Sequence, residues 1–338
     1  MDYSAIIQSI QQGNFSPVYF LQGDEPFFID NIIEHLEENV VESSQQDFNQ
    51  FIFYGKEIDF PSLISTARKF PMMGERQLVI VKEAQEIKGW NNETNQSILT
   101  EYLKQPSPST VLAFGYKYKS LDKRTKLAKA FQQEAIVLTS KKIYDNQIPD
   151  WIQGYVKAKH VQISPKAVRL LSENIGNNLQ RLSNEIEKLL LNIPENQPID
   201  EQAVHRYVGI SRDYNTFELQ AALGSGNHLK AQKIVKYFAA NPSSHPLVLT
   251  IYNLYSYFSK LLMIHQSPRK DKQTVAQAIG VHPFFAEEYI RAIRLYPQAK
   301  VLSNLQYLHE ADLASKGIGQ LVPADGDLLK ELIFKLMN

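Results

Sequence analysis

The stretch that decides the fold is residues 18–28, VYFLQGDEPFF. Its first four residues form a continuous apolar run, which predicts a strand that is covered on both faces. An amphipathic helical pattern begins at Pro26 and continues to about residue 41. A strand that leads directly into a helix is typical of the βαβ unit of a parallel sheet. This stretch therefore predicts an α/β domain.

The same alternation continues outward from this stretch. Further short β-rich runs occupy residues 51–54, 77–81, 111–114 and 135–138, and another amphipathic stretch covers residues 90–103. Beyond about residue 145 the patterns are helical, beginning with the cap Ser164 and the first-turn Pro165. We therefore expect an α/β plus all-α chain: a five-stranded three-layer domain over 1–145, a small helical domain over 146–210 and a larger one over 211–338.

Composition excludes several classes of protein. The chain has 338 residues, no cysteine, and 36 basic residues against 36 acidic ones. Without cysteine there are no disulfides or thiolate metal sites, which suits the cytoplasm. The first residues do not have the pattern of a signal sequence, and no long apolar run predicts a membrane span. The balanced charge means that any contact with nucleic acid must be local.

The turn after the first strand is where a nucleotide would bind in such a domain. Gly23, Asp24 and Glu25 occupy it, and no GxxxxGK[ST] pattern exists in the chain. The two carboxylates would repel a nucleotide's phosphates. Lys82 follows the run 77–81, where a working ATPase needs a magnesium-binding Asp. We expect a degenerate nucleotide site that takes no cofactor.

Met72 and Met73 are an apolar pair among turn and charged residues, just before the run 77–81. Methionine is unbranched and polarizable, so it fills irregular pockets on partner proteins as well as gaps in its own core. Both interpretations remain open from this segment alone. Phe70, Pro71 and Arg76 would form the rim of a contact, or merely end a helix and begin a strand.

Basic residues gather between residues 117 and 142, with Tyr116 and Tyr118 among them. Lysines beside aromatic rings suit phosphate contact with base stacking, although a solvated helix face has the same pattern. The candidate DNA-binding residues are Lys117, Lys119, Lys123, Arg124, Lys126 and, near the end of the chain, Lys316. The acidic face around Glu34 and Glu37 lacks HExxH spacing, so no metal site is predicted. No GxSxG or other nucleophile motif is present.

Together these features resemble the delta subunit of the bacterial DNA polymerase III clamp loader. The residues that carry the resemblance are YFLQGDEPF at 19–27, PMMGERQLV at 71–79 and NEIEKL at 184–189. The resemblance implies an AAA+-like fold with a degenerate nucleotide site, a helical lid domain and a helical collar domain for oligomerisation. It covers essentially the whole chain.

The resemblance also implies a function. Members of that family bind the sliding clamp and open its ring for loading onto primed DNA in replication, without hydrolysing ATP themselves. A pair of hydrophobic residues on a helix enters the clamp, and the matching positions here are Met72 and Met73. The chain would then be a noncatalytic subunit of the DNA polymerase III holoenzyme, classed with DNA-directed DNA polymerase by association.

The implied partners are the sliding clamp, the ATPase subunits and a delta-prime-like subunit of the loader, and primer-template DNA, with no membrane. Ring opening requires tighter binding to the open ring than to the closed one. Two alternatives remain: an active AAA+ ATPase, which the missing phosphate loop disfavours, and a DNA-binding adaptor of a replication or repair complex that never touches a clamp.

Overall fold

The computed structural model describes residues 2–72, 74–194, 197–209, 214–318 and 324–338. The chain separates into two compact units, residues 1–143 and 144–338, and each is described by itself below. The further division of the second unit near residue 210 stays a prediction.

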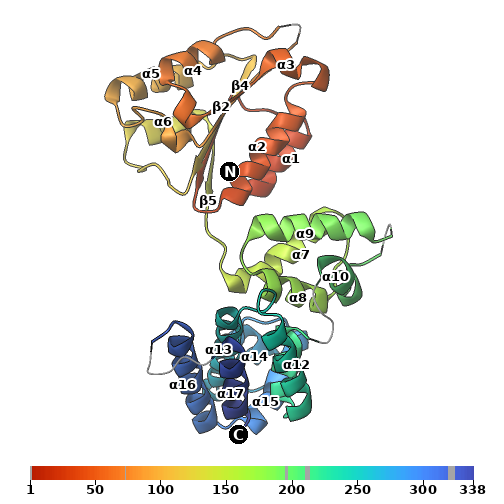
Figure 1. Ribbon diagram of the computed structural model, residues 1–338. Coiled ribbons are helices and arrows are strands. Elements are labelled where there is room, and N and C mark those ends of the chain that lie inside the picture. The colour runs from red at the N-terminus through yellow and green to blue at the C-terminus, as the bar shows by residue number, and fades with distance from the viewer. Residues whose placement is uncertain (1, 73, 195–196, 210–213, 319–323) are drawn as a thin grey trace. The chain divides into compact units, whose positions relative to one another are not determined.

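The first unit is built on one parallel sheet of five strands (Figure 1). The strand order is β2-β3-β4-β1-β5, so β4 and β1 lie inside the sheet while β2 and β5 form its edges. Each strand lies where the sequence predicts it: β1 (Val18–Gly23), β2 (Gln50–Tyr54), β3 (Gln77–Lys82), β4 (Thr110–Lys117) and β5 (Ile136–Ser140).

Helices cover both faces of this sheet, as the continuous apolar runs require. One face packs on α1 (Tyr3–Gln11) and α2 (Pro26–Asn39), and the other on α4 (Phe60–Ala67), α5 (Glu93–Lys104) and α6 (Lys126–Glu134). Alternate residues of β1 pack into the cores on the two faces of the sheet, because successive side chains of a strand point to opposite faces. Tyr19 and Leu21 join the α2 side, and Val18 and Phe20 the α5 side.

Short segments connect the remaining parts of the first unit. The four-residue α3 (Gln46–Asn49) leads directly into β2. The 3-10 turns η1 (Ser43–Gln45), η2 (Gly55–Glu57) and η3 (Ala84–Glu86) complete the connections. The strand order, read from the other edge as β5-β1-β4-β3-β2, is that of an AAA+-like domain, and the predicted fold class is confirmed.

The second unit is helical throughout its described residues, apart from one isolated bridge between Ile163 and Ile199. It opens with the 3-10 turn η4 (Asp145–Gln147). Its first helices are α7 (Ile148–Ala158), α8 (Pro165–Ile175), α9 (Leu179–Asn192) and α10 (Glu201–Val208). The predicted cap is confirmed, since the Ser164 side chain accepts a hydrogen bond from the Ala167 amide and Pro165 begins α8.

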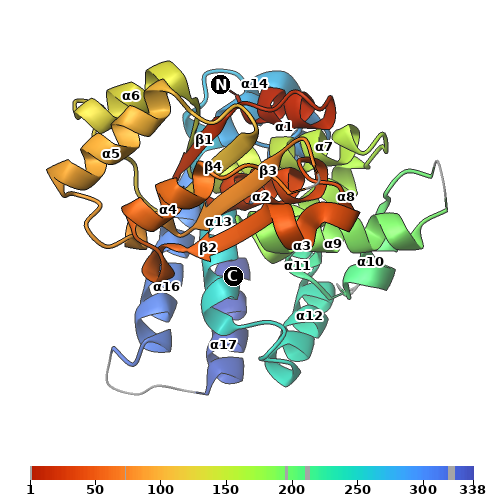
Figure 2. The ribbon, with the colours of Figure 1, turned by 90° about the horizontal axis from the view of Figure 1, so that it is seen from above.

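Further helices follow and share one large core. They are α11 (Thr216–Gly224), α12 (His228–Ala240), α13 (Leu247–Gln266), α14 (Lys272–Ile279), α15 (Pro283–Leu295), α16 (Gln298–Ser315) and α17 (Asp325–Met337). Figure 2 shows the axes of α12, α13, α16 and α17 roughly aligned, with the chain running in opposite directions in α16 and α17. Buried side chains from all seven helices make up this core.

Helix α13 is the one described helix long and apolar enough to span a membrane by length and composition alone. The core helix of a helical domain has the same length and composition. Eight of its residues are buried, among them Leu254, Phe258 and Leu261 in the core of the second unit. The absence of a membrane partner stays an expectation from the sequence.

Candidate functional site

The segment between α4 and β3 is the first candidate site, and it is a loop. The predicted helix does not extend to Met72, because α4 ends at Ala67 and Met72 lies in a bend beyond it. Pro71 explains the difference, since a proline disfavours helical backbone at the residue before it and removes a backbone donor. The apolar side chains are therefore presented by a loop instead of a helix tip.

Two large apolar side chains protrude from this loop. Phe70 is 85% exposed and Met72 is 60% exposed, while Pro71 is half-buried. Met73, the second predicted contact residue, lies outside the described residues. Exposure of two neighbouring large apolar groups is unfavourable in water unless a partner covers them.

Two buried amide side chains hold the loop at separate points. Asn49, 1% exposed, accepts a hydrogen bond from the Met72 amide at 2.6 Å and donates one to the Met72 carbonyl at 2.8 Å. Gln77, also 1% exposed, donates to the Lys69 carbonyl at 2.6 Å and to Thr110 Oγ1 at 2.8 Å. The backbone on both sides of Phe70 is thus fixed from within the first unit.

The far end of the loop is also fixed. The Arg76 guanidinium lies 5.3 Å from the ring centroid of Phe15, within the range of a cation–π contact. Gly74 passes so close to Gln45 that a Cβ there would lie 2.3 Å from Gln45 Oε1. A shallow, polar-lined depression of about 810 Å³ adjoins this end, between residues 38–45 and 74–76.

The second candidate site is the turn after β1, where the sequence predicts a degenerate nucleotide site. Every backbone amide of this turn is already used: Gly23 donates to the Lys119 carbonyl at 3.0 Å, Asp24 to the Ser140 carbonyl at 3.1 Å, and Glu25 to Ser140 Oγ at 3.2 Å. Phosphate binding at a helix start needs free amides. The amides of Gly23, Asp24 and Glu25 are therefore not free to bind a phosphate.

The amino terminus of α2 carries a protein carboxylate where a phosphate would lie. Glu25 is the cap of α2, and its Oε1 accepts the Phe27 amide at 3.3 Å. Burial raises the pKa of Glu25, while the Phe27 amide and the nearby Lys142 oppose that rise. The positive end of the helix dipole thus acts on Glu25. Asp24 is exposed beside it.

The edge of the sheet that would bind magnesium carries ion pairs instead. Lys82 Nζ lies 2.7 Å from Glu37 Oε1 on α2, and Lys117 Nζ lies 2.7 Å from Asp30 Oδ1 on the same helix. No group of three or more His, Asp or Glu side chains able to hold a metal ion occurs among the described residues.

The predicted basic residues lie beside this turn. The loop from Tyr118 to Thr125 passes over the end of β1, with the Tyr118 amide donating to the Gly23 carbonyl at 2.8 Å. Lys119, Lys123 and Lys126 are exposed, and so is the Tyr118 ring. Arg124 is exposed, but its Nε and Nη2 donate two hydrogen bonds to the Asp122 carboxylate. These bonds raise the pKa of Arg124 and lower that of Asp122.

The remaining candidate DNA-binding residues, Lys117 and Lys316, are each held in an ion pair. The Lys117 side chain is 17% exposed and paired with Asp30, so it is the least available of the set. Lys316 lies far along the chain in the second unit, where it pairs with Asp312 at 2.6 Å. The neighbouring Gly319 is outside the described residues. The structure therefore brings together the basic loop and the degenerate turn within the first unit.

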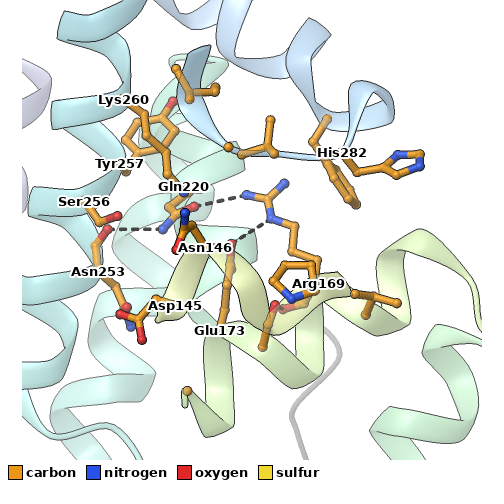
Figure 3. Close-up of a pocket in the computed structure, with 18 of the residues that line it drawn as sticks. Asp145, Asn146, Arg169, Glu173, Gln220, Asn253, Ser256, Tyr257, Lys260 and His282 are labelled. Atoms are coloured by element: carbon orange, nitrogen blue, oxygen red, sulfur yellow. Dashed lines mark hydrogen bonds and ion pairs between the residues drawn. The ribbon is translucent and has the colours of Figure 1, made fainter. Parts of the chain in front are cut away.

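The second unit contains a cavity of about 350 Å³ that the sequence does not predict. Figure 3 shows Arg169 beside it, bonded to Glu173 and Gln220, with Gln220 also bonded to the backbone of Asn253. Arg169 is 8% exposed, reaches Glu288 at 3.3 Å, and its guanidinium lies 4.0 and 4.6 Å from the ring centroids of Phe217 and Phe285. Its donors are committed to the protein, so Arg169 is a structural residue.

Lys260 also lines this cavity, and burial lowers its pKa. Its ammonium lies 6.0 Å from the ring centroid of Tyr289. Carboxylates from Glu173 and Asp145 line the same space, so the cavity has no surplus of either charge. This arrangement favours neither an anionic nor a cationic ligand.

Sequence reasoning misses Asn49, Gln77 and Arg169. Asn and Gln are common in polar turns, so the run QDFNQ at 46–50 contains no signal that Asn49 is buried. Arg169 has the pattern of an ordinary cation on an amphipathic helix. Their roles depend on partners distant in the chain.

The fold and the turn after β1 define a class: an AAA+-like chain with a helical second unit, in which the amides of Gly23, Asp24 and Glu25 are already bonded within the protein. Residues 19–141 match the family model described as DNA polymerase III, delta subunit. A relative from Bacillus subtilis (strain 168), DNA polymerase III subunit delta, is 27% identical over 315 residues, covering 91% of this chain and 90% of the relative.

A solved structure of the same kind supports the fold. The Bacillus subtilis DNA clamp loader delta protein matches with a TM-score of 0.60 and 24% identity, covering 99% of each chain. The resemblance inferred from the sequence is confirmed: this chain is similar to the delta subunit of DNA polymerase III, by the family model over residues 19–141 and by the relative over most of its length.

Proposed function

We propose that this chain binds the DNA sliding clamp through the loop that presents Phe70 and Met72, and opens the ring for loading onto primed DNA. The observation that carries the proposal is the exposure of these two side chains on a backbone fixed by buried Asn49. Binding energy at protein interfaces concentrates in a few apolar anchors that enter pockets on the partner. Met73 and Pro71 complete the proposed contact.

Ring opening follows if the chain binds the open ring more tightly than the closed one. A ligand shifts an equilibrium only by its difference in affinity for the two states. The other loader subunits, including the ATPase subunits and a delta-prime-like subunit, would supply the ATP-driven step. The occupied amides around Gly23 support a role without hydrolysis in this chain. The cytoplasm is the compartment we propose for it.

The first experiment measures binding of the purified chain to its cognate clamp, with Met72→Ala/Met73→Ala as the test variant. Each truncation is expected to weaken binding by about 10- to 100-fold, because a buried methionine contributes roughly 1.5–3 kcal/mol. Leu191→Ala is the matched control, since Leu191 is 86% exposed in the second unit. Equal binding by wild type and the double variant would reject this contact site.

A second measurement separates opening from binding. The clamp is prepared with its ring interfaces covalently cross-linked, so that the open state is removed. A protein that opens the clamp should bind the cross-linked ring more weakly than the free ring. A protein that binds the clamp without opening it should bind both rings with equal affinity. Equal affinities would therefore contradict the opening step while leaving clamp binding in place.

Contact with primer-template DNA is a second proposed activity, supported by the exposed Lys119, Lys123 and Lys126 beside the exposed Tyr118 ring. Replacing the three lysines by Gln should weaken DNA binding. It should also reduce the dependence of log K on log salt by about 0.9 for each duplex phosphate that a lysine no longer neutralises. Lys316→Gln tests the separate candidate in the second unit. DNA binding without any clamp binding would instead favour the adaptor alternative.

A further inference from the structure

We infer that Asn49 is the positioning residue of the clamp-binding loop: it holds the Met72 backbone in the binding conformation before any partner arrives. This inference rests on the proposed function. Asn49 itself is buried and so is not exposed to a partner, and it would act through Met72.

The contact between the Asn49 side chain and the Met72 backbone resembles the pairing of two residues on neighbouring strands, in which one residue bonds both the amide and the carbonyl of the other. The Asn49 side chain offers an acceptor and a donor side by side, and it uses them on the amide and carbonyl of one residue, Met72, at 2.6 and 2.8 Å. Both backbone groups of Met72 are thereby satisfied without any regular secondary structure. Buried polar groups need such partners, and a side-chain amide can supply both at once.

The surroundings show that Asn49 is itself held. It ends α3 and immediately precedes β2, whose five residues pair with β3 of the sheet. Gly74 lies close to the same amide, and a Cβ there would come within 3.1 Å of Asn49 Nδ2. The loop is therefore packed against Asn49 on both sides of residue 73. A side chain fixed by the sheet transmits that rigidity to Met72.

Holding the loop in one conformation raises affinity without adding a contact. A protein whose binding-competent state is only partly populated binds with an apparent Kd raised by the inverse of that population. Preorganisation removes this cost and the ordering entropy. Truncating Asn49 would leave Met72 present but would reduce the fraction of molecules that present it correctly.

This difference predicts a kinetic signature. Asn49→Ala should lower kon for the clamp by about 5- to 30-fold, because it removes two net hydrogen bonds of the competent conformer. The koff should change little, since the bound contacts are the same. Met72→Ala should instead act mainly on koff, as interface truncations do.

The matched control is Asn95→Ala. Asn95 also braces a loop of the first unit, with its Nδ2 donating to the Gly89 carbonyl at 3.1 Å, but it is not bonded to the Met72 loop. It should leave both rate constants unchanged. Hydrogen exchange of the Met72 amide supplies a readout that does not involve the clamp: Asn49→Ala should accelerate exchange there and Asn95→Ala should not.

The outcomes distinguish this inference from the proposed function. If Met72→Ala weakens clamp binding and Asn49→Ala leaves kon unchanged for the folded fraction, the positioning role is overturned and the contact site stands. If the wild-type chain does not bind the clamp, the proposed function fails, and unchanged Met72 exchange in Asn49→Ala would overturn the ordering role as well. Should Asn49→Ala not fold, Asn49→Ser is measured, because its hydroxyl is too short to reach both Met72 groups.

Discussion

Lys82 and Glu37 form an ion pair in which Lys82 Nζ lies 2.7 Å from Glu37 Oε1. Lys82 is the last residue of β3, and Glu37 belongs to the helix α2 that covers this face of the sheet. The carboxyl end of this strand is where an ATPase of this architecture holds magnesium through an Asp. Lys82 therefore stands where that Asp ligand would be, and its positive charge would repel a magnesium ion.

The first prediction concerns nucleotide. The isolated chain should not bind Mg-ATP, and Lys82→Asp should not restore binding, because the amides of Gly23, Asp24 and Glu25 remain engaged. Equilibrium binding of a fluorescent ATP analogue checks both proteins. Tight binding by Lys82→Asp would mean that the amides are released easily and that the strand end alone prevents nucleotide binding. The ion pair is worth about 1 kcal/mol or less, so Lys82→Met should remain folded.

The second prediction concerns Gly23. Its φ is +127°, and a Cβ there would lie 2.1 Å from the Ser140 carbonyl oxygen. Gly23→Ala should therefore lower the free energy of unfolding of the first unit by about 3 kcal/mol or more, through strain and displacement of β5. Urea denaturation followed by Trp90 fluorescence measures it, with Trp151 replaced by Phe.

Gly13→Ala is the control for that experiment. Gly13 also has a positive φ, +74°, but a Cβ there would meet no atom within 4 Å. Its cost should be about 1 kcal/mol, from backbone conformation alone. Equal costs at Gly13 and Gly23 would contradict the steric account of the closed turn.

The sequence predicts the sheet well because the strands are covered on both faces. Runs such as Leu78 to Val81 must be apolar throughout, and this makes them recognisable without knowledge of their partners. The helix starts are local as well, since Ser164 and Asp200 cap the helices that directly follow them. These features depend on residues close together in the chain.

The candidate site is predicted only in part, because it depends on residues that are far apart in the chain. Met72 is noticeable in the sequence because it belongs to a short apolar group that charged and turn residues surround. The loop that presents it depends on Asn49, which is 23 residues away. The helix expected there ends early because Pro71 and the Gln77 side chain act on its carboxyl end. Arg169 is more distant still from its partners Gln220 and Glu288. Pattern reasoning cannot find such pairings.

The third prediction concerns Arg169. Arg169→Met should lower the free energy of unfolding of the second unit by about 3 kcal/mol, because Glu173 and Glu288 then lose their cation in a partly buried site. Hydrogen exchange of α8 and α11 reports the local effect. Arg169→Lys should recover only part of the loss, since lysine cannot reach both carboxylates and Gln220 while contacting the rings of Phe217 and Phe285. Full recovery by lysine would show that charge alone matters.

The fourth prediction concerns alkaline pH. Burial raises the pKa of both Tyr289 and Tyr296 from 10.0 to about 12 in the folded second unit. A raised pKa means that folding favours the neutral phenol, so the stabilisation is complete below pH 10 and is lost as the pH rises towards 12. The second unit should lose about 2–3 kcal/mol per tyrosine across this interval. Thermal unfolding at a series of pH values measures the loss.

Tyr296→Phe identifies the source of that pH dependence. The Tyr296 hydroxyl donates to the Leu223 carbonyl at 3.2 Å, so its removal should cost about 1 kcal/mol at neutral pH. Above pH 10 the variant should lose less stability than the wild type, because one of the phenols whose pKa is raised in the folded second unit is gone. Tyr144→Phe is the control, since Tyr144 is 66% exposed. A wild-type slope that persists unchanged in Tyr296→Phe would assign the alkaline transition to other groups.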